Sequence, residues 1–182
     1  FLTDQQTPMI WRGPMVTSAI KTFTQKVNWK DLDFIIVDMP PGTGDTQLTF
    51  SQEIKMDGAI IVSTPQDLAL IDARKGLNMF NKVNVPVLGI IENMSHFICP
   101  DCGSRHEIFG YGGAQAEAAL IGVPFLGEVP LEMKIRVTSD QGNPIVVSQP
   151  DSPHAQHYLL IAEKILNGLI YGQAPAPKIV FE

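Results

Sequence analysis

Apolar segments with the length of β-strands alternate along this chain with segments that have the periodicity of amphipathic helices. The expected strands are short and rich in branched aliphatic residues, and they cover residues 33–39, 58–64, 85–94, 123–130 and 143–148. The expected helices cover residues 17–27, 45–54, 67–83, 113–122 and 154–170. Because strands that are apolar on both faces need cover on both sides, this order predicts an α/β fold, a mostly parallel sheet with helices on both faces.

Length and charge narrow the class of protein. The chain has 182 residues, which suits one domain over residues 1–170, followed by a Pro- and Ala-rich extended or mobile tail at 171–182. The net charge is −6 without any cluster of Lys and Arg, so no nucleic acid and no membrane is expected as a partner. No signal peptide or membrane-spanning run is visible, which favours a cytoplasmic location. The chain opens without Met, as a fragment of a longer domain would.

The stretch FIIVDMPPGTGDTQL at residues 34–48 differs by one letter from a phosphate-binding P-loop. A P-loop would have Lys where this chain has Asp45, and a carboxylate there would repel phosphate. Asp38 ends the apolar run at the carboxyl end of an expected strand, where such an acid holds Mg²⁺ in many phosphate-handling proteins. Gly42 and Gly44 belong to the mobile loop behind it. The alternative is a solvated Asp followed by a plain turn.

Two more strand ends carry residues suited to a nucleotide. Asn93 ends the apolar run GIIEN, and its amide can both donate to and accept from an adenine edge, although Asn also commonly caps its own turn. Pro130 follows another strand and could back a base, or simply end the strand. The glycine-rich IFGYGGAQAE has Gln115 where a dinucleotide fingerprint needs its third Gly, so we interpret it as a lead into a helix.

The two cysteines of the chain, Cys99 and Cys102, form a C-x-x-C pair with Gly103 directly after it. Such a thiolate pair serves zinc, an iron–sulfur cluster or redox exchange, and the redox alternative lacks a thioredoxin-like setting. Two thiolates fill half of a four-ligand site. A symmetric homodimer could supply two cysteines per subunit, or His96 and His106 could complete a local zinc site.

Taken together, the motifs resemble the Mrp/ApbC family of MinD-like P-loop ATPases that carry iron–sulfur clusters. The motifs WRGPM, DFIIVDMPPGTGD, TPQDLALIDARKG, GIIENMS, CPDCG, IFG, LGEVPL and SDQGNPI occur in the family's order, over about residues 9–170. The resemblance implies that Asp38 is the Walker B-type acid, that Asn93 contacts adenine, and that the loop after Pro130 closes on the base. It also implies a bridging 4Fe–4S cluster held by Cys99 and Cys102 of two subunits.

The chain departs from the family in one large respect. The glycine-rich Walker A loop, G-x-x-x-x-G-K-S/T, occurs nowhere in the 182 residues, so we expect an MinD-like fold without its N-terminal strand and P-loop. The resemblance implies an ATP- and Mg²⁺-dependent carrier that passes clusters to apo-proteins, with ATP hydrolysis in the full-length parent and little or none in this chain alone. The rival hypotheses are a zinc-stapled scaffold with a vestigial nucleotide site and a MinD-type partition ATPase.

Overall fold

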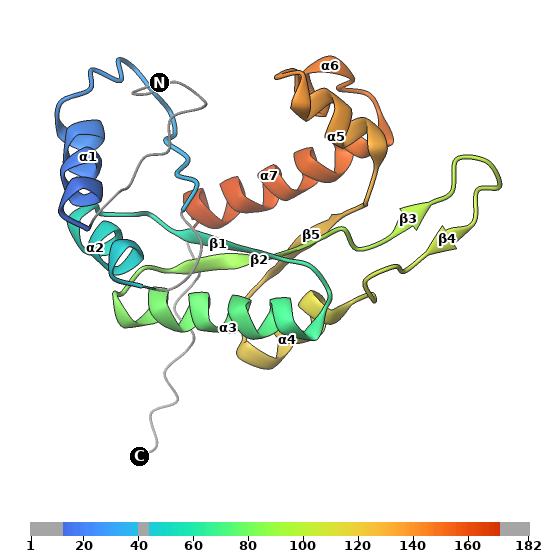
Figure 1. Cartoon of the computed structure of the whole chain (residues 1–182), viewed down its shortest axis with the longest axis horizontal. Helices are drawn as coiled ribbons and strands as arrows, with labels where there is room; N and C mark the ends of the chain where they lie inside the picture. The colour runs from blue at the N-terminus through green and yellow to red at the C-terminus, as the bar shows by residue number, and fades with distance from the viewer. Residues whose placement is uncertain (1–12, 40–43, 172–182) are drawn as a thin grey trace.

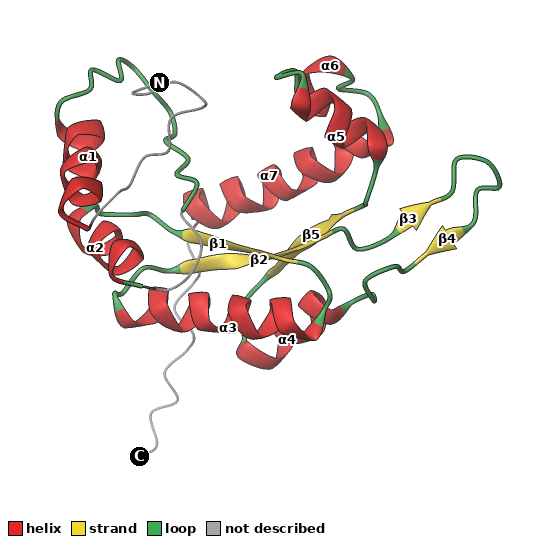
Figure 2. Cartoon of the chain, viewed as in Figure 1, coloured by secondary structure: helices red, strands yellow, loops and turns green. Residues whose placement is uncertain are grey.

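The computed structural model describes residues 13–39 and 44–171 of the chain. In chain order the elements are α1 (Gly13–Gln25), α2 (Asp45–Glu53), β1 (Ala59–Ser63), α3 (Asp67–Lys82), β2 (Val87–Asn93), β3 (Phe97–Ile98), β4 (Arg105–His106), α4 (Gly113–Ile121), β5 (Phe125–Val129), α5 (Met133–Asp140), α6 (Ile145–Ser148) and α7 (Pro153–Tyr171). A central sheet lies between helices, and the β3–β4 hairpin projects from one end of it (Figures 1 and 2).

The sheet consists of β1, β2 and β5 in the order β1-β2-β5, and both neighbouring pairs are parallel. Parallel neighbours need a crossover between them, and the helices α3 and α4 supply these connections. Gly89 in the middle strand has φ 153°, and a Cβ at this position would lie 2.5 Å from the carbonyl oxygen of Pro124. Glycine therefore permits the close approach of β2 to the chain entering β5.

Helices cover both faces of this sheet, as the sequence predicted. On one face α3 and α4 pack against β1 and β2, and on the other α7 packs against β5 (Figure 1). The first core includes Ile61, Leu77, Phe80, Ile90 and Ala118. The second core is smaller and consists of Leu126, Val129 and Ile161 with half-buried neighbours. Burial of each large aliphatic side chain contributes roughly 1.5–3 kcal/mol, so both cores stabilise the packing of the helices on the sheet.

The strand expected at residues 33–39 is absent, and that prediction is wrong. The segment has no regular secondary structure and pairs with none of the described strands, so β1 forms an edge of the sheet. Its apolar side chains are exposed, Phe34 by 57%, Ile35 by 58% and Ile36 by 93%. An isolated segment cannot form a strand, because a strand exists through its hydrogen bonds to a neighbour. The apolar pattern indicates which residues favour burial and does not supply the neighbour.

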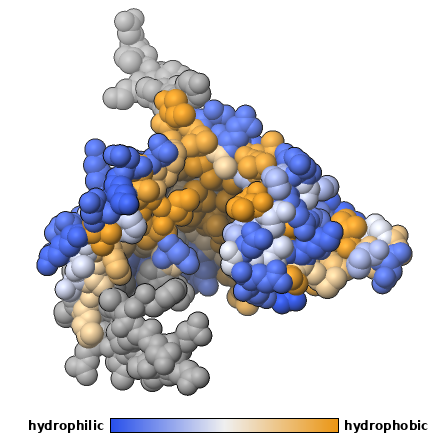
Figure 3. Space-filling view, turned by 90° about the horizontal axis from the view of Figure 1, so that it is seen from above, coloured by the Kyte–Doolittle hydropathy of each residue, from blue (hydrophilic) through white to orange (hydrophobic). Residues whose placement is uncertain are grey.

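An apolar hollow lies on the face of β1 opposite α3. Ile60 and Val62 alternate with buried Ile61 along β1 and are 38% and 59% exposed. Figure 3 shows apolar side chains gathered in this hollow on the upper face of the molecule. A soluble domain rarely exposes so much contiguous apolar surface unless something covers it.

The strand expected at residues 143–148 is also wrong, because these residues form the short helix α6. The helix begins after Pro144, whose φ of −53° suits a helix start, and the backbone N–H groups of Val147 and Ser148 donate to the carbonyl oxygen of Pro144. The preceding helix α5 was not predicted, and Gly142 with φ 68° follows its end. Local turn chemistry has thus overridden the strand propensity of Ile145, Val146 and Val147.

The other elements are confirmed with shifts of a few residues at their ends. The expected strands 58–64, 85–94 and 123–130 are β1, β2 and β5. The expected helices correspond to α1, α2, α3, α4 and α7, and α3 has Asp67 in its first turn and Lys82 in its last, which suits the helix dipole. Among the described residues, no helix is both long enough and apolar enough to cross a membrane.

Candidate functional site

Asn93 and Pro130 lie at the edge of the sheet where the carboxyl ends of the parallel strands meet. Asn93 is the last residue of β2, and it lies opposite Val129, the last residue of β5. Pro130 follows directly and is buried. In open α/β sheets ligands bind at this edge. The structure therefore brings the two expected nucleotide-contacting residues onto adjacent strands.

The side chain of Asn93 forms a turn at this edge. Its Oδ1 accepts a hydrogen bond from the backbone N–H of Met94 at 3.0 Å, and Met94 has φ 55°, in the left-handed region. Within the described part of the chain, the Asn93 amide nitrogen donates to no acceptor. The oxygen thus stabilises the turn, while the amide N–H groups can still donate to a ligand. The adenine contact stays a prediction.

The loop that precedes α2 is only partly described. Asp38 is exposed and lies in the irregular segment before this loop, so it does not end a strand as the sequence predicted. Gly44 is the N-cap of α2 in an extended conformation, and its carbonyl oxygen accepts from the N–H of Leu48 at 3.2 Å. Gly42 lies outside the described residues. The roles of Asp38 towards Mg²⁺ and of the two glycines towards phosphate stay predictions.

A buried carboxylate that the sequence analysis missed lies next to Asn93. Glu92 is 0% exposed, and its two oxygens accept from the N–H groups of Gly112 at 3.0 Å and Ala114 at 2.8 Å, at the start of α4. A Cβ at Gly113 would lie 2.6 Å from the carbonyl oxygen of Pro65, so glycine is needed there. The glycine-rich segment therefore leads into α4, and the buried carboxylate of Glu92 holds it in place. The feature of the sequence that could have indicated this contact is a Glu inside an otherwise apolar strand.

The two cysteines lie in the connection of the projecting β3–β4 hairpin. The N–H of Cys99 donates to the carbonyl oxygen of Ser104, and the N–H of Gly103 donates to the carbonyl oxygen of Cys99, both at 2.9 Å. Gly103 has φ 70°, which closes this tight turn. Cys99 is half-buried, Cys102 is exposed, and both thiols are free. The turn presents both sulfur atoms from a short, ordered loop.

The turn also favours the thiolate form of Cys102. Its Sγ lies 3.2 Å from Ser104 Oγ. Hydrogen bonding from the Ser104 side chain lowers the pKa of Cys102, with further contributions from the Ser104 backbone and from Cys99. The thiolate is the form that binds metals, so this turn suits Cys102 to the role of a ligand, which stays a prediction.

His96 lies at the base of the hairpin in a polar cluster with two other residues. Its Nδ1 is 2.8 Å from the Oγ of Ser95 and 3.8 Å from a carboxylate oxygen of Glu128 on β5. Ser95 is 0% exposed and His96 is 8% exposed. Burial lowers the pKa of His96, and Arg105 lowers it further, while Glu128 opposes both. His96 is thus buried where the base of the hairpin meets β5.

His106 has a different environment from His96. It is exposed on β4, opposite Phe97, with ring centroids 6.4 Å apart. In residues 13–39 and 44–171, no group of three or more His, Cys, Asp and Glu side chains is placed to hold a metal ion. The alternative zinc site of Cys99, Cys102, His96 and His106 is therefore not preformed in this structure.

Comparison with solved structures defines the class of this protein. A nucleotide-binding protein from Archaeoglobus fulgidus in complex with ADP superposes with a TM-score of 0.67 at 37% identity, over 78% of this chain and 57% of that one. The cell division ATPase MinD of Pyrococcus furiosus has the same fold, with a TM-score of 0.63 at 23% identity, over 86% of this chain and 59% of that one. The fold is that of the MinD-like P-loop NTPases, as expected.

Comparison of sequences defines the family. A family model described as ParA, NUBPL iron-transfer P-loop NTPase, matches residues 1–166, and the chain belongs to that family. The iron–sulfur cluster transfer protein NUBPL of Mus musculus is 53% identical over 169 residues, which are 93% of this chain and 53% of that protein. The iron–sulfur cluster carrier protein of Pseudomonas fragi is 50% identical over 169 residues, 93% of this chain and 59% of that protein.

A plant relative adds information about location. The iron–sulfur protein required for NADH dehydrogenase of Arabidopsis thaliana, named as mitochondrial, is 52% identical over 168 residues, 92% of this chain and 54% of that protein. The relatives therefore include an organellar protein, and a cytoplasmic location for this chain stays a prediction. The chain spans about half the length of the curated relatives that it matches.

Proposed function

We propose that this chain forms the cluster-holding part of an ATP-dependent iron–sulfur cluster carrier. The observation that carries the proposal is the pair of free cysteines on a projecting hairpin, one half-buried and one exposed. In this account the cargo is a 4Fe–4S cluster, which two subunits hold at a homodimer interface and pass to apo-proteins. The cluster carrier names of relatives at about 50% identity support the same function.

The number of ligands supports the proposed homodimer. A 4Fe–4S cluster takes four cysteine thiolates, and each chain contains 2 cysteines in total. In a two-fold symmetric dimer the same surface meets its own copy, so two hairpins can supply Cys99 and Cys102 twice. The position of the cysteines at the outer end of the hairpin favours such a meeting, because the body of each subunit lies behind it (Figure 2).

Transfer to an apo-protein needs ligands that an incoming thiol can replace. Cys102 is exposed, and the hydrogen bonds from Ser104 lower its pKa, which makes it both a good ligand and a good leaving group. Cys99 is half-buried and bonded through its backbone to Ser104 and Gly103. We therefore propose that Cys102 leaves the cluster first and that Cys99 holds it until the recipient's thiols have bound.

ATP would act through the strand edge from which the hairpin starts. Asn93 ends β2 at the expected base-binding position, and Phe97 starts β3 shortly after it. Two backbone hydrogen bonds, from Ser95 N–H to Val129 oxygen at 3.1 Å and from Leu131 N–H to His96 oxygen at 2.7 Å, hold this connection against the chain leaving β5. A nucleotide bound at the edge would thus bias the position of the hairpin, with Asp38 placing Mg²⁺.

Replacement of the cysteines tests the proposal. Cys99→Ser or Cys102→Ser should abolish cluster binding after anaerobic reconstitution, because the serine hydroxyl is a poor ligand for iron, and should lower the cluster-dependent dimer fraction. His106→Ala is the matched control, since its side chain is exposed on the same hairpin, and it should load normally. Cluster content unchanged in both cysteine variants would contradict the proposal.

A further inference from the structure

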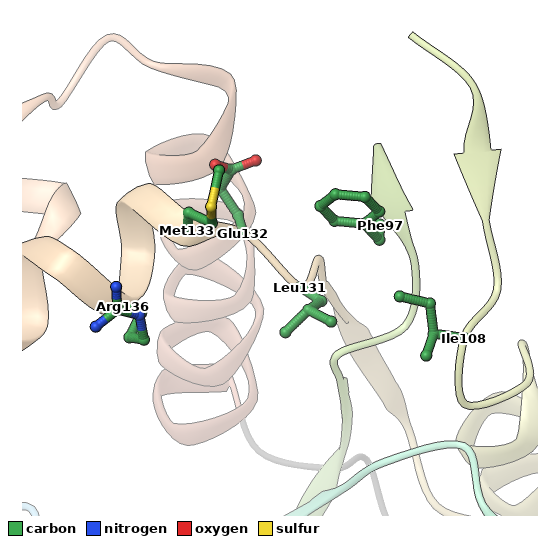
Figure 4. Close-up of a pocket in the computed structure, with 6 residues that line it drawn as sticks. All are labelled: Phe97, Ile108, Leu131, Glu132, Met133 and Arg136. Atoms are coloured by element: carbon green, nitrogen blue, oxygen red, sulfur yellow. The ribbon is translucent and has the colours of Figure 1, made fainter. Parts of the chain in front are cut away.

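The β3–β4 hairpin that carries the two cysteines projects away from the central sheet. Among the described elements, its two strands pack mainly against each other (Figure 1). On the α5 side an apolar pocket of about 270 Å³ lies next to the hairpin. Figure 4 shows this pocket between Met133 on α5 and two residues on the side of the hairpin, Phe97 and Ile108. The position of the cysteine turn therefore depends strongly on the contacts that the hairpin makes on its other side.

One of these contacts is a cation–π pair on β4. The guanidinium of Arg105 lies over the ring of Tyr111, and its central carbon is 4.5 Å from the ring centroid. Across the hairpin Arg105 pairs with Ile98, and this is the last strand pair before the turn that holds Cys99 and Cys102. The cation–π pair therefore acts on the hairpin directly beside the cysteine turn.

The backbone of Tyr111 is held at the edge of the sheet where the parallel strands end. Tyr111 directly precedes Gly112, whose N–H donates to the buried carboxylate of Glu92 on β2 at 3.0 Å. Gly113 lies against the chain leaving β1, since a Cβ at this position would be 2.6 Å from the carbonyl oxygen of Pro65. The ring of Tyr111 therefore offers Arg105 a contact that is fixed to the ends of two strands.

We propose that Arg105 and Tyr111 are positioning residues that hold the cysteine turn against the sheet edge and so slow the release of the cluster. The inference rests on the proposed function, because only a bound cluster can be released. The backbone hydrogen bonds of Ser95 and His96 join the connection before β3 to the chain leaving β5. The cation–π pair adds a second attachment at β4, on the side of the turn where the exposed Cys102 lies.

The exposure of the pair limits the size of its effect. The side chain of Arg105 is 40% exposed and Tyr111 is 49% exposed. At such a site a cation–π contact changes an equilibrium by about two- to fivefold. Because the thiolates themselves bind the cluster, loss of the pair should leave the amount of bound cluster unchanged and alter the rate at which the turn opens and the cluster leaves.

Amide hydrogen exchange of the metal-free chain tests the positioning. The N–H of Cys99 donates across the turn to the carbonyl oxygen of Ser104, the residue before Arg105, so its exchange rate reports opening of the turn. Tyr111→Leu should raise this rate about two- to fivefold, because leucine has no aromatic face. Tyr111→Phe keeps the ring and should retain the original rate, and the N–H of Ile90 in the sheet should be unaffected in both variants. Equal exchange of Cys99 in the two variants would overturn the inference.

A double-mutant cycle with the same measurement tests whether Arg105 is the partner of Tyr111. Arg105→Gln removes the cation and should also speed the exchange of the Cys99 N–H. Combined with Tyr111→Leu it should add little further, because both substitutions remove one and the same contact. Effects that add in full would show that the two side chains act separately, and would overturn the pair as the attachment.

Release of the cluster tests the consequence and separates this inference from the proposed function. After anaerobic reconstitution, Tyr111→Leu should hold as much iron as the unaltered chain and lose it to the chelator bipyridyl about two- to fivefold faster, while Tyr111→Phe should behave like the unaltered chain. Equal release rates in all three chains would overturn the inference and leave the proposed function standing. A chain that never loads iron, but whose Cys99 N–H exchanges faster in Tyr111→Leu, would contradict the function and support the attachment of the turn.

Discussion

At the scale of single residues, we expect Ser104 to set the reactivity of Cys102, because its side chain is the main cause of the lowered pKa of this thiol. Ser104→Ala removes the side-chain hydrogen bond that is the main cause of the lowered pKa of Cys102. The pKa of this thiol should rise, and the pH at which the metal-free protein is half-maximally alkylated by iodoacetamide should rise with it. The Cys99→Ser background isolates the signal of Cys102. An unchanged pH profile in Ser104→Ala would contradict this explanation of thiolate formation.

Glu92 shows how one buried side chain joins two elements. Glu92→Gln leaves one of the two N–H donors, at Gly112 or Ala114, facing an amide NH₂ group instead of an acceptor. The free energy of unfolding should fall by about 1–3 kcal/mol, the cost of one unsatisfied buried hydrogen-bonding group. Urea denaturation measures this, with Glu163→Gln as an exposed control on α7. Equal stability of the two variants would show that Glu92 does not anchor α4.

The buried His96 makes stability depend on pH. Burial and Arg105, with a smaller contribution from His157, lower its pKa in the folded state, while Glu128 and Glu107 oppose them less strongly. The unfolded chain therefore binds a proton more readily than the folded one, so stability is complete above the unfolded pKa of about 6.5 and falls as pH drops below it.

The His96 prediction is tested by comparing variants over this pH range. His96→Gln should flatten the decline in stability from neutral pH to about pH 5, because the glutamine side chain has no charge to gain. His106→Gln, at an exposed position on the same hairpin, should retain the decline. If the free energy of unfolding falls equally with pH in the unaltered protein and in His96→Gln, then His96 is not the cause of the lower stability in acid.

At the scale of elements, the sequence predicts most strands and helices but not their partners. The strands β1, β2 and β5 follow from apolar runs bounded by turns, and α3 follows from helical spacing. Residues 33–39 have the same apolar pattern as β2 and yet form no strand, since pairing depends on a neighbour that no local pattern encodes. At residues 143–148, the local effect of Pro144 exceeded the strand propensity of the residues after it.

The candidate site shows the same difference between features set by local sequence and contacts between distant segments. The positions of residues in short motifs were predictable: Cys99 and Cys102 lie in a tight turn, and Asn93 and Pro130 lie at adjacent strand ends, while their roles stay predictions. Contacts between distant segments were not predictable. His96, in the connection after β2, meets Glu128 on β5, and only the pairing of β2 with β5 brings the two residues together.

At the scale of the whole molecule, two features bear on whether this chain can bind ATP. Its sequence contains no Walker A motif, and an apolar hollow over β1 is exposed. We expect residues 1–182 alone to bind ATP weakly and not to hydrolyse it, because phosphoryl transfer depends on a cradle for the β- and γ-phosphates that this sequence lacks. Adding a strand and a loop with the motif G-x-x-x-x-G-K-S/T before residue 1 should give Mg²⁺-dependent hydrolysis. Asp38→Asn in this extended chain should lower turnover while the fold persists.

Phosphate release measures this prediction, and the nucleotide-free extended chain serves as its baseline. Equally fast hydrolysis by residues 1–182 without the extension would mean that the nucleotide site has been placed wrongly. Unchanged turnover in Asp38→Asn would remove Asp38 from the site and leave the fold assignment intact.

We expect two chains to share one cluster through Cys99 and Cys102. The most direct test is anaerobic reconstitution of the unaltered chain with iron and sulfide, followed by measurement of iron, sulfide, zinc and molecular mass in solution. The account predicts about four irons and four sulfides for every two chains, all in a species with the mass of a dimer. One tightly bound zinc in each single chain, with no iron–sulfur species at any chain concentration, would contradict it.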